Sequence, residues 1–109
     1  MQLTRRRLIS AGGLAAAAAA LPAAAAPAVR VRIRKFAFDP DTVSIKAGER
    51  IEWVNEDFAP HTATEADHSW DTGEMGKGGT ASVLFETPGT HSYYCVYHPH
   101  MKARIVVTA

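Results

Sequence analysis

The residues best suited to chemistry gather in one heptapeptide, Cys95-Val96-Tyr97-His98-Pro99-His100-Met101. It contains the only cysteine of the chain, a histidine three positions later and a methionine three positions further on. A thiolate, an imidazole and a thioether are soft to borderline donors, and one more imidazole gives a His2Cys set with a weak Met, as in copper electron-transfer sites. Zinc gains little from a thioether, and structural zinc sites usually contain two or more cysteines. The spacing therefore favours copper over zinc, and over a cysteine that merely fills the core.

A second imidazole must come from elsewhere in the chain. His61 follows Pro60, which fixes its own backbone and extends the residue before it, so His61 is expected to be held in place before a metal binds. His68 lies in a loose polar segment, and His91 lies within an expected strand. His100 lies inside the heptapeptide itself. We therefore predict His61 as the second histidine ligand and a surface role for the other three.

The first 28 residues have the layout of an export signal. Three arginines, Arg5 to Arg7, precede an apolar run over residues 8–21, and small residues with overlapping Ala-x-Ala sites fill positions 23–28. Paired arginines directly before the apolar run resemble a twin-arginine signal. An uncleaved membrane anchor is the alternative, but the glycines, Pro22 and weakly apolar alanines disfavour it. We predict that residues 1–28 are a removed signal, that residues 29–109 form the mature domain in the periplasm, and that no stable membrane insertion occurs.

Charge and size restrict the remaining function classes. Loss of the three signal arginines leaves nine Lys and Arg against eleven Asp and Glu, which changes the formal charge from +1 to −2. A slightly acidic domain has no general nucleic-acid footprint. Roughly 80 residues make one small domain without an internal disulfide, so a bound metal would add useful stability. A monomer is expected.

The mature chain shows a hydrophobic period of two, which is typical of half-buried strands. The expected strands are residues 29–34, 42–46, 50–54, 80–86, 91–95 and 104–108. Residues 67–79 contain four glycines and are expected to form a loop with at most one short strand. Short strands separated by Gly, Pro and Asp predict an all-β, single-domain antiparallel sandwich or barrel.

Four sequence features together resemble the small blue copper proteins, the cupredoxins: Asn55, Pro60-His61, Pro88-Gly89-Thr90 and Cys95-x-x-His98-x-x-Met101. The short ligand loop is similar to that of the amicyanins rather than to the longer loops of plastocyanins or pseudoazurins. The likeness runs from about Phe36 to the end of the chain.

The resemblance implies a fold and a ligand set. The fold is an eight-stranded Greek-key β-sandwich with one copper ion near one end. The ligands are His61, Cys95 and His98 in a trigonal set, with Met101 as the weak axial ligand. The resemblance also assigns Asn55 to tying the His61 loop to the Cys95 loop, and Pro60 and Pro99 to supporting the site.

The implied function is a periplasmic type 1 copper protein that carries single electrons and is not an enzyme. Expected partners are transient redox proteins such as a cytochrome c or a periplasmic dehydrogenase or reductase, which dock on a patch formed by Ala59, Pro60, Met75, Tyr97 and Pro99. The alternative is a periplasmic copper-binding or copper-delivery protein of the same fold. A copper enzyme would need further copper sites, for which the chain is too short. His91 and His100 depart from the family pattern, and His100 is a candidate competitor of Met101 at the axial position.

Overall fold

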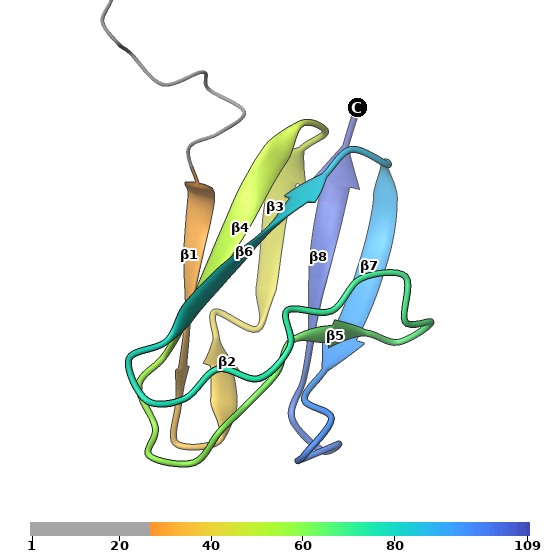
Figure 1. Cartoon of the computed structure of the whole chain (residues 1–109). Coiled ribbons are helices and arrows are strands. Elements are labelled where there is room, and N and C mark those ends of the chain that lie inside the picture. The colour runs from red at the N-terminus through yellow and green to blue at the C-terminus, as the bar shows by residue number, and fades with distance from the viewer. Residues whose placement is uncertain (1–26) are drawn as a thin grey trace, which may run out of the picture.

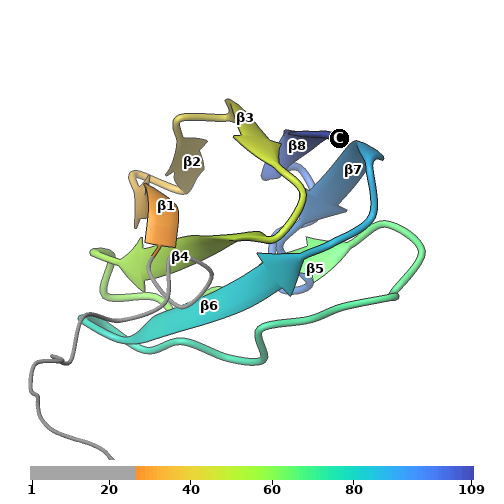
Figure 2. The ribbon, with the colours of Figure 1, turned by 90° about the horizontal axis from the view of Figure 1, so that it is seen from above.

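Two four-stranded sheets face each other in the computed structural model, which describes residues 27–109 (Figure 1). The strands are β1 (Pro27–Arg34), β2 (Ala37–Asp39), β3 (Thr42–Lys46), β4 (Glu49–Asn55), β5 (Thr64–Glu65), β6 (Thr80–Phe85), β7 (Gly89–Tyr94) and β8 (Lys102–Thr108). One sheet has the order β2-β1-β4-β6 and the other the order β3-β8-β7-β5. Seen from above, the strands of both sheets surround a common interior (Figure 2).

The predicted all-β, single-domain sandwich is confirmed, and all six predicted strands are present with ends shifted by up to two residues. The expectation of purely antiparallel pairing is wrong. β1 runs parallel to β4, and β3 runs parallel to β8. The β1–β4 pair is parallel because the chain passes through β2 and then through β3 of the second sheet before β4 returns to lie beside β1.

The first strand of the domain begins close to the predicted end of the export signal. β1 begins at Pro27, two residues before the domain start predicted at residue 29, and pairs with β4 from Arg50 onward. The rest of the predicted signal lies outside the described residues. Within residues 27–109, no helix is long and apolar enough to cross a membrane.

The alternating pattern of β1 separates core from surface as the sequence predicts. Val31 and Ile33 are fully buried. The three arginines that alternate with them point outward, and each pairs with a carboxylate at 2.7–2.9 Å. The pairs are Arg30 with Glu52, Arg32 with Glu56 and Arg34 with Asp39. The strand that looks cationic in the sequence therefore carries a row of ion pairs.

The β1–β2 hairpin has an unexpected turn. Arg34 pairs with Ala37, so only Lys35 and Phe36 form the loop, and both have positive φ (54° and 57°). Positive φ at both central residues defines a type I′ turn, which usually contains Asn-Gly. Both backbone N–H groups donate to Asp57, at 2.8 and 3.0 Å. The carboxylate therefore holds a turn that its own two residues do not favour.

Residues 67–79, expected to form a loop with at most one short strand, contain no strand and are attached to the sandwich by two isolated bridges. Met75 bridges to His61, and Asp71 bridges to Thr64. The β4–β5 segment and the β7–β8 loop lie at the same end of the sandwich, the lower end in Figure 1. This end brings the predicted ligands together.

Candidate metal centre

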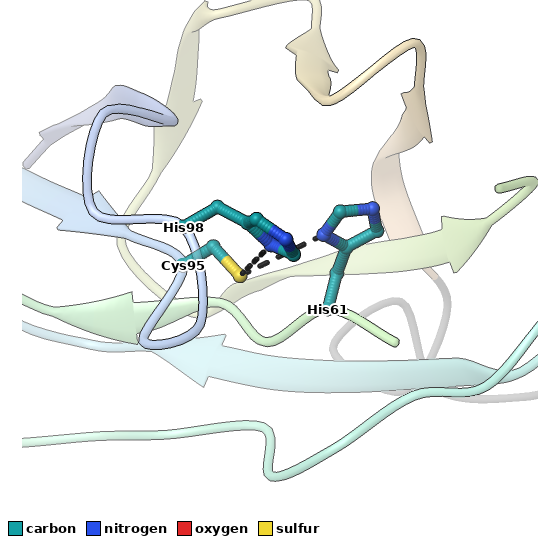
Figure 3. A group of neighbouring side chains, drawn as sticks. All are labelled: His61, Cys95 and His98. Carbon is teal, nitrogen blue, oxygen red and sulfur yellow. Dashed lines mark hydrogen bonds between the residues drawn. The ribbon is translucent and has the colours of Figure 1, made fainter. Parts of the chain in front are cut away.

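Three of the predicted ligands converge between the β4–β5 segment and the β7–β8 loop (Figure 3). The Cys95 Sγ lies 3.7 Å from His61 Nδ1 and 3.7 Å from His98 Nδ1. His61 and Cys95 are fully buried, and His98 is partly exposed. Within residues 27–109 this is the only group of three or more His, Cys, Asp or Glu side chains close enough to share an ion.

The separations fit a metal at the centre of the group. Bonds of about 2.0 Å to nitrogen and about 2.3 Å to sulfur, meeting at a trigonal angle, place N and S about 3.7 Å apart. One thiolate with two neutral imidazoles is the trigonal donor set of type 1 copper. The geometry and the chemistry of the donors therefore agree with the predicted copper site.

The β7–β8 loop is closed by its own backbone. Cys95 N–H donates to the Met101 carbonyl at 3.1 Å, and Met101 N–H donates to the His98 carbonyl at 2.8 Å. His98 N–H donates back to the Cys95 carbonyl at 3.2 Å. Met101 is 3% exposed, whereas Pro99 lies on the surface. The loop therefore holds Cys95, His98 and Met101 in a fixed arrangement, with the thioether side chain buried.

His61 is fixed from both sides of its ring. Nδ1 faces the thiol, and Nε2 lies 2.9 Å from Asp57 Oδ2. Because a carboxylate only accepts, Nε2 carries the proton and Nδ1 keeps a free lone pair toward the site. Burial by itself raises the pKa of Asp57, but hydrogen bonds from the backbone N–H groups of Phe36 and Lys35 and from His61 outweigh it and lower the pKa. Asp57 is therefore an anionic anchor that selects the tautomer able to bind a metal.

Phe36 covers the two imidazoles. Its ring lies edge-on to His61 and to His98, with centroids 5.2 and 4.8 Å apart, and it is itself 44% exposed. The type I′ turn places this ring over the site. Sequence reasoning missed both Phe36 and Asp57 as site residues. Phe36 reaches the site through a turn that a carboxylate more than 20 positions away holds, which no local pattern reveals. Asp57 lies only four positions before His61, and that spacing was the available signal.

Asn55 lies beside the site, but its contacts differ from those that the resemblance implies. Its amide donates to the carbonyls of Ala59 and Met75, both at 2.9 Å, and its side-chain oxygen accepts from Asp57 N–H. These bonds shape the segment that leads to Pro60 and His61. They run to the β4–β5 and 66–79 segments rather than to the Cys95 loop.

Thr62 makes the connection between the two ligand loops. Its N–H donates to Cys95 Sγ at 3.4 Å, and its hydroxyl oxygen accepts from Val96 N–H at 3.0 Å. Residue 96 is a valine, whose side chain offers an asparagine no polar partner. A threonine directly after a ligand histidine was the available sequence signal.

The remaining histidines have other neighbours. His68 Nε2 lies 3.4 Å from the Tyr94 hydroxyl, and His91 pairs with Glu65 at 3.3 Å. The exposed His100 ring lies 6.3 Å from the His98 ring, centroid to centroid. None of the three belongs to the group of converging donors.

Comparisons with known proteins agree with this geometry. The chain is 36% identical over 105 residues to amicyanin-alpha of Methylorubrum extorquens, covering 90% of this chain and 88% of that protein. It is 32% identical to the amicyanin of Paracoccus versutus, covering 73% of this chain and 64% of that protein. It is also 33% identical to the plastocyanin of Scenedesmus fuscus, covering 61% of this chain and 76% of that protein.

Solved structures give the same result. The Cu(I) form of an amicyanin variant matches with a TM-score of 0.70 and 29% identity, covering 78% of this chain and 89% of that one. The crystal structure of Paracoccus versutus amicyanin matches with a TM-score of 0.63 and 32% identity, covering 78% and 88%. The cupredoxin-like domain family matches residues 7–107. With its two-sheet fold and its His2Cys centre, the chain belongs to the cupredoxin-like family.

Proposed function

We propose that this protein is an electron carrier that holds one type 1 copper ion through His61, Cys95, His98 and Met101. The observation that carries the proposal is the pair of 3.7 Å distances from the buried Cys95 sulfur to the two imidazole nitrogens. The first three residues would supply a thiolate and two imidazoles, and Met101 would supply a weak thioether ligand. Pro60 and Pro99 stiffen the backbone next to the two histidines.

Bound copper supplies the one-electron chemistry by alternating between Cu(I) and Cu(II). The chain's own contribution is to hold the donor side chains in place. Asp57 holds the His61 ring from behind, and the backbone bonds of the β7–β8 loop hold Cys95, His98 and Met101. Full burial of His61 and Cys95 keeps water from their donor atoms, whereas His98 is partly exposed. A rigid, dry site is what an electron carrier needs, because little rearrangement then accompanies each transfer.

His98 is the electron port of this proposal, because it is the one trigonal ligand that is partly exposed. Large apolar side chains are exposed on the segments around it: Phe36 (44%), Phe58 (88%), Val96 (43%) and Tyr97 (48%). They form the docking surface, with Pro60 and Pro99 also exposed. Met75, which the sequence placed in this patch, is only 3% exposed because it is held against His61 by backbone bonds of 2.8 and 3.1 Å.

Partners of such a surface bind transiently. Redox encounters use interfaces below about 1,200 Å², and an apolar patch rather than a charged one does most of the recognition here. The arginines of β1 are engaged in ion pairs, and we propose no nucleic-acid partner. A cytochrome c, or a dehydrogenase or reductase of the periplasm, fits this description. The carrier is a monomer and not an enzyme.

The location follows from the sequence. Residues 1–28 are an export signal of the twin-arginine type, which is removed, and residues 29–109 are the mature cupredoxin domain in the periplasm. Export in a folded state would allow the thiol to be protected by the metal in an oxidising compartment.

The experiment that tests the function is copper loading followed by spectroscopy and voltammetry. Copper-loaded protein should show an intense visible thiolate-to-Cu(II) band and reversible one-electron cycling at an electrode. Cys95→Ser should abolish the band, because no other thiol exists in the chain, whereas Ser92→Ala on β7 should retain it. Copper binding without reversible cycling would favour the copper-delivery alternative, and an intensely coloured Cys95→Ser protein would contradict the ligand assignment.

A further inference from the structure

A row of buried hydroxyl groups leads away from the Cys95 loop. Val96 N–H donates to Thr62 Oγ1 at 3.0 Å, and Thr62 Oγ1 lies 3.0 Å from Thr64 Oγ1. Thr64 Oγ1 in turn donates to Asp71 Oδ1 at 3.0 Å. Thr62 is 5% exposed and Thr64 is fully buried, so these hydroxyls depend on one another for hydrogen bonds.

The direction of the row follows from proton counting. Each threonine has one hydroxyl proton. Thr64 uses its proton on the Asp71 carboxylate, so it must accept from Thr62. Thr62 then gives its proton to Thr64 and accepts from Val96 N–H. All donors therefore point the same way, from the ligand loop toward Asp71, which also accepts from Gly73 N–H at 2.8 Å.

We infer that Thr64 and Asp71 are positioning residues that hold the Cys95–Val96 peptide through Thr62. This inference rests on the proposed copper function. Thr62 follows His61 in the chain and donates its own N–H to Cys95 Sγ. We call the three bonds from Val96 through Thr62 and Thr64 to Asp71 the relay. The relay fixes the separation between the His61 segment and the Cys95 loop, which are 34 positions apart.

The relay matters because Val96 has little other protection. Val96 is 43% exposed, and its backbone N–H donates to Thr62 Oγ1. If Thr64 cannot accept, the buried Thr62 hydroxyl loses its acceptor, and a buried unsatisfied hydroxyl is unfavourable. Thr62 then turns toward another partner, and the peptide after the copper thiolate becomes mobile.

The first test uses metal-free protein, so that it does not depend on copper. Amide hydrogen exchange at Val96 should be about five-fold faster in Thr64→Val, which corresponds to one typical hydrogen bond. Thr64→Ser keeps the hydroxyl and should exchange like the parent protein. Thr72→Val is the matched control: its hydroxyl bonds Ala63 N–H and the Gly73 carbonyl in the same segment, but it does not reach the ligand loop.

Asp71 provides an independent variant at an exposed position, which keeps the test decisive if Thr64→Val does not fold. Asp71→Ala removes the acceptor and should reproduce the faster exchange at Val96. Asp71→Asn retains an oxygen acceptor and should not. Unchanged exchange in Asp71→Ala, or equal acceleration in Thr72→Val, would overturn the relay.

The second test uses the copper-loaded variants. Thr64→Val and Asp71→Ala should shift the thiolate-to-Cu(II) band and slow electron self-exchange, and Thr64→Ser should restore both. Altered exchange at Val96 with an unchanged band and rate would overturn the positioning role. Absence of the band in the parent protein would instead refute the proposed function and leave the exchange result valid.

Discussion

The backbone conformation of Phe36 can be tested by comparing the stabilities of two variants at this position. With φ at 57°, this residue occupies the left-handed region, which costs an ordinary side chain about 1–2 kcal/mol. Glycine avoids that cost but gains entropy in the unfolded chain worth about 0.4–1 kcal/mol. We therefore expect Phe36→Gly to be about 0.5–1 kcal/mol more stable than Phe36→Ala.

Both variants should be less stable than the parent protein. The Phe36 ring is about half buried and makes edge contacts with His61 and His98. Partial burial of a phenylalanine and two ring contacts together give a loss of about 2 kcal/mol for Phe36→Ala. Phe36→Gly should lose correspondingly less, since it relieves the strained backbone.

Urea denaturation of the metal-free proteins measures these differences. Metal-free protein is needed because copper bound to the folded state would add its own stabilisation. Ala37→Gly is the matched control: Ala37 begins β2, where glycine should cost about 0.5–1 kcal/mol relative to alanine. Phe36→Gly could instead be less stable than Phe36→Ala by about the amount that Ala37→Gly costs. In that case residue 36 would not be left-handed, and the hairpin turn would differ from the one described.

The remaining predictions concern the axial ligand, the core and the metal. Met101→Gln should keep copper but lower the reduction potential by more than about 59 mV, a tenfold change in relative affinity for the two oxidation states, since an oxygen ligand favours Cu(II). His100→Phe should change the potential by less than that amount, and voltammetry showing the reverse pattern would assign the axial position to His100. Tyr93→Phe should destabilise the protein by about 1–3 kcal/mol in urea denaturation. The buried Trp53 Nε1–H loses the Tyr93 hydroxyl, which accepts its hydrogen bond at 3.3 Å. A loss of stability near zero would mean that this bond contributes nothing. Removing copper should lower the unfolding temperature, by an amount that grows with the free copper concentration in the reference sample, and calorimetry showing no such dependence would exclude binding specific to the folded state.

The sequence by itself determined six of the eight strands and the candidate donor atoms. The alternation in residues 29–34 predicted which side chains of β1 are buried, because a strand exposes opposite faces at successive residues. Cys95, His98 and Met101 lie in one short loop, so their proximity needs no long-range information. His61 was also identifiable, since Pro60 marks a stiff turn at the end of a predicted strand.

Two strands could not be predicted because their signals are not local. The β1–β2 hairpin contains Lys35 and Phe36 in place of Asn-Gly, and its turn is held by Asp57, more than 20 residues away. β5 has only two residues and exists through its pairing with β7. The parallel pairing of β1 with β4 likewise depends on the path that the chain takes through the second sheet.

The surroundings of the ligands were decided by the tertiary structure alone. In the sequence alone, an aspartate, a phenylalanine and a threonine look like ordinary surface or strand residues. They become parts of the site only when folding brings Asp57, Phe36 and Thr62 against His61, His98 and the Cys95 loop. Ligand identity is a property of residue type and spacing. Ligand orientation depends on hydrogen bonds and ring contacts. The bond from Asp57 to His61 spans only four positions, whereas the contacts of Thr62 with the Cys95 loop and of Phe36 with the two imidazoles join distant segments and have no local pattern.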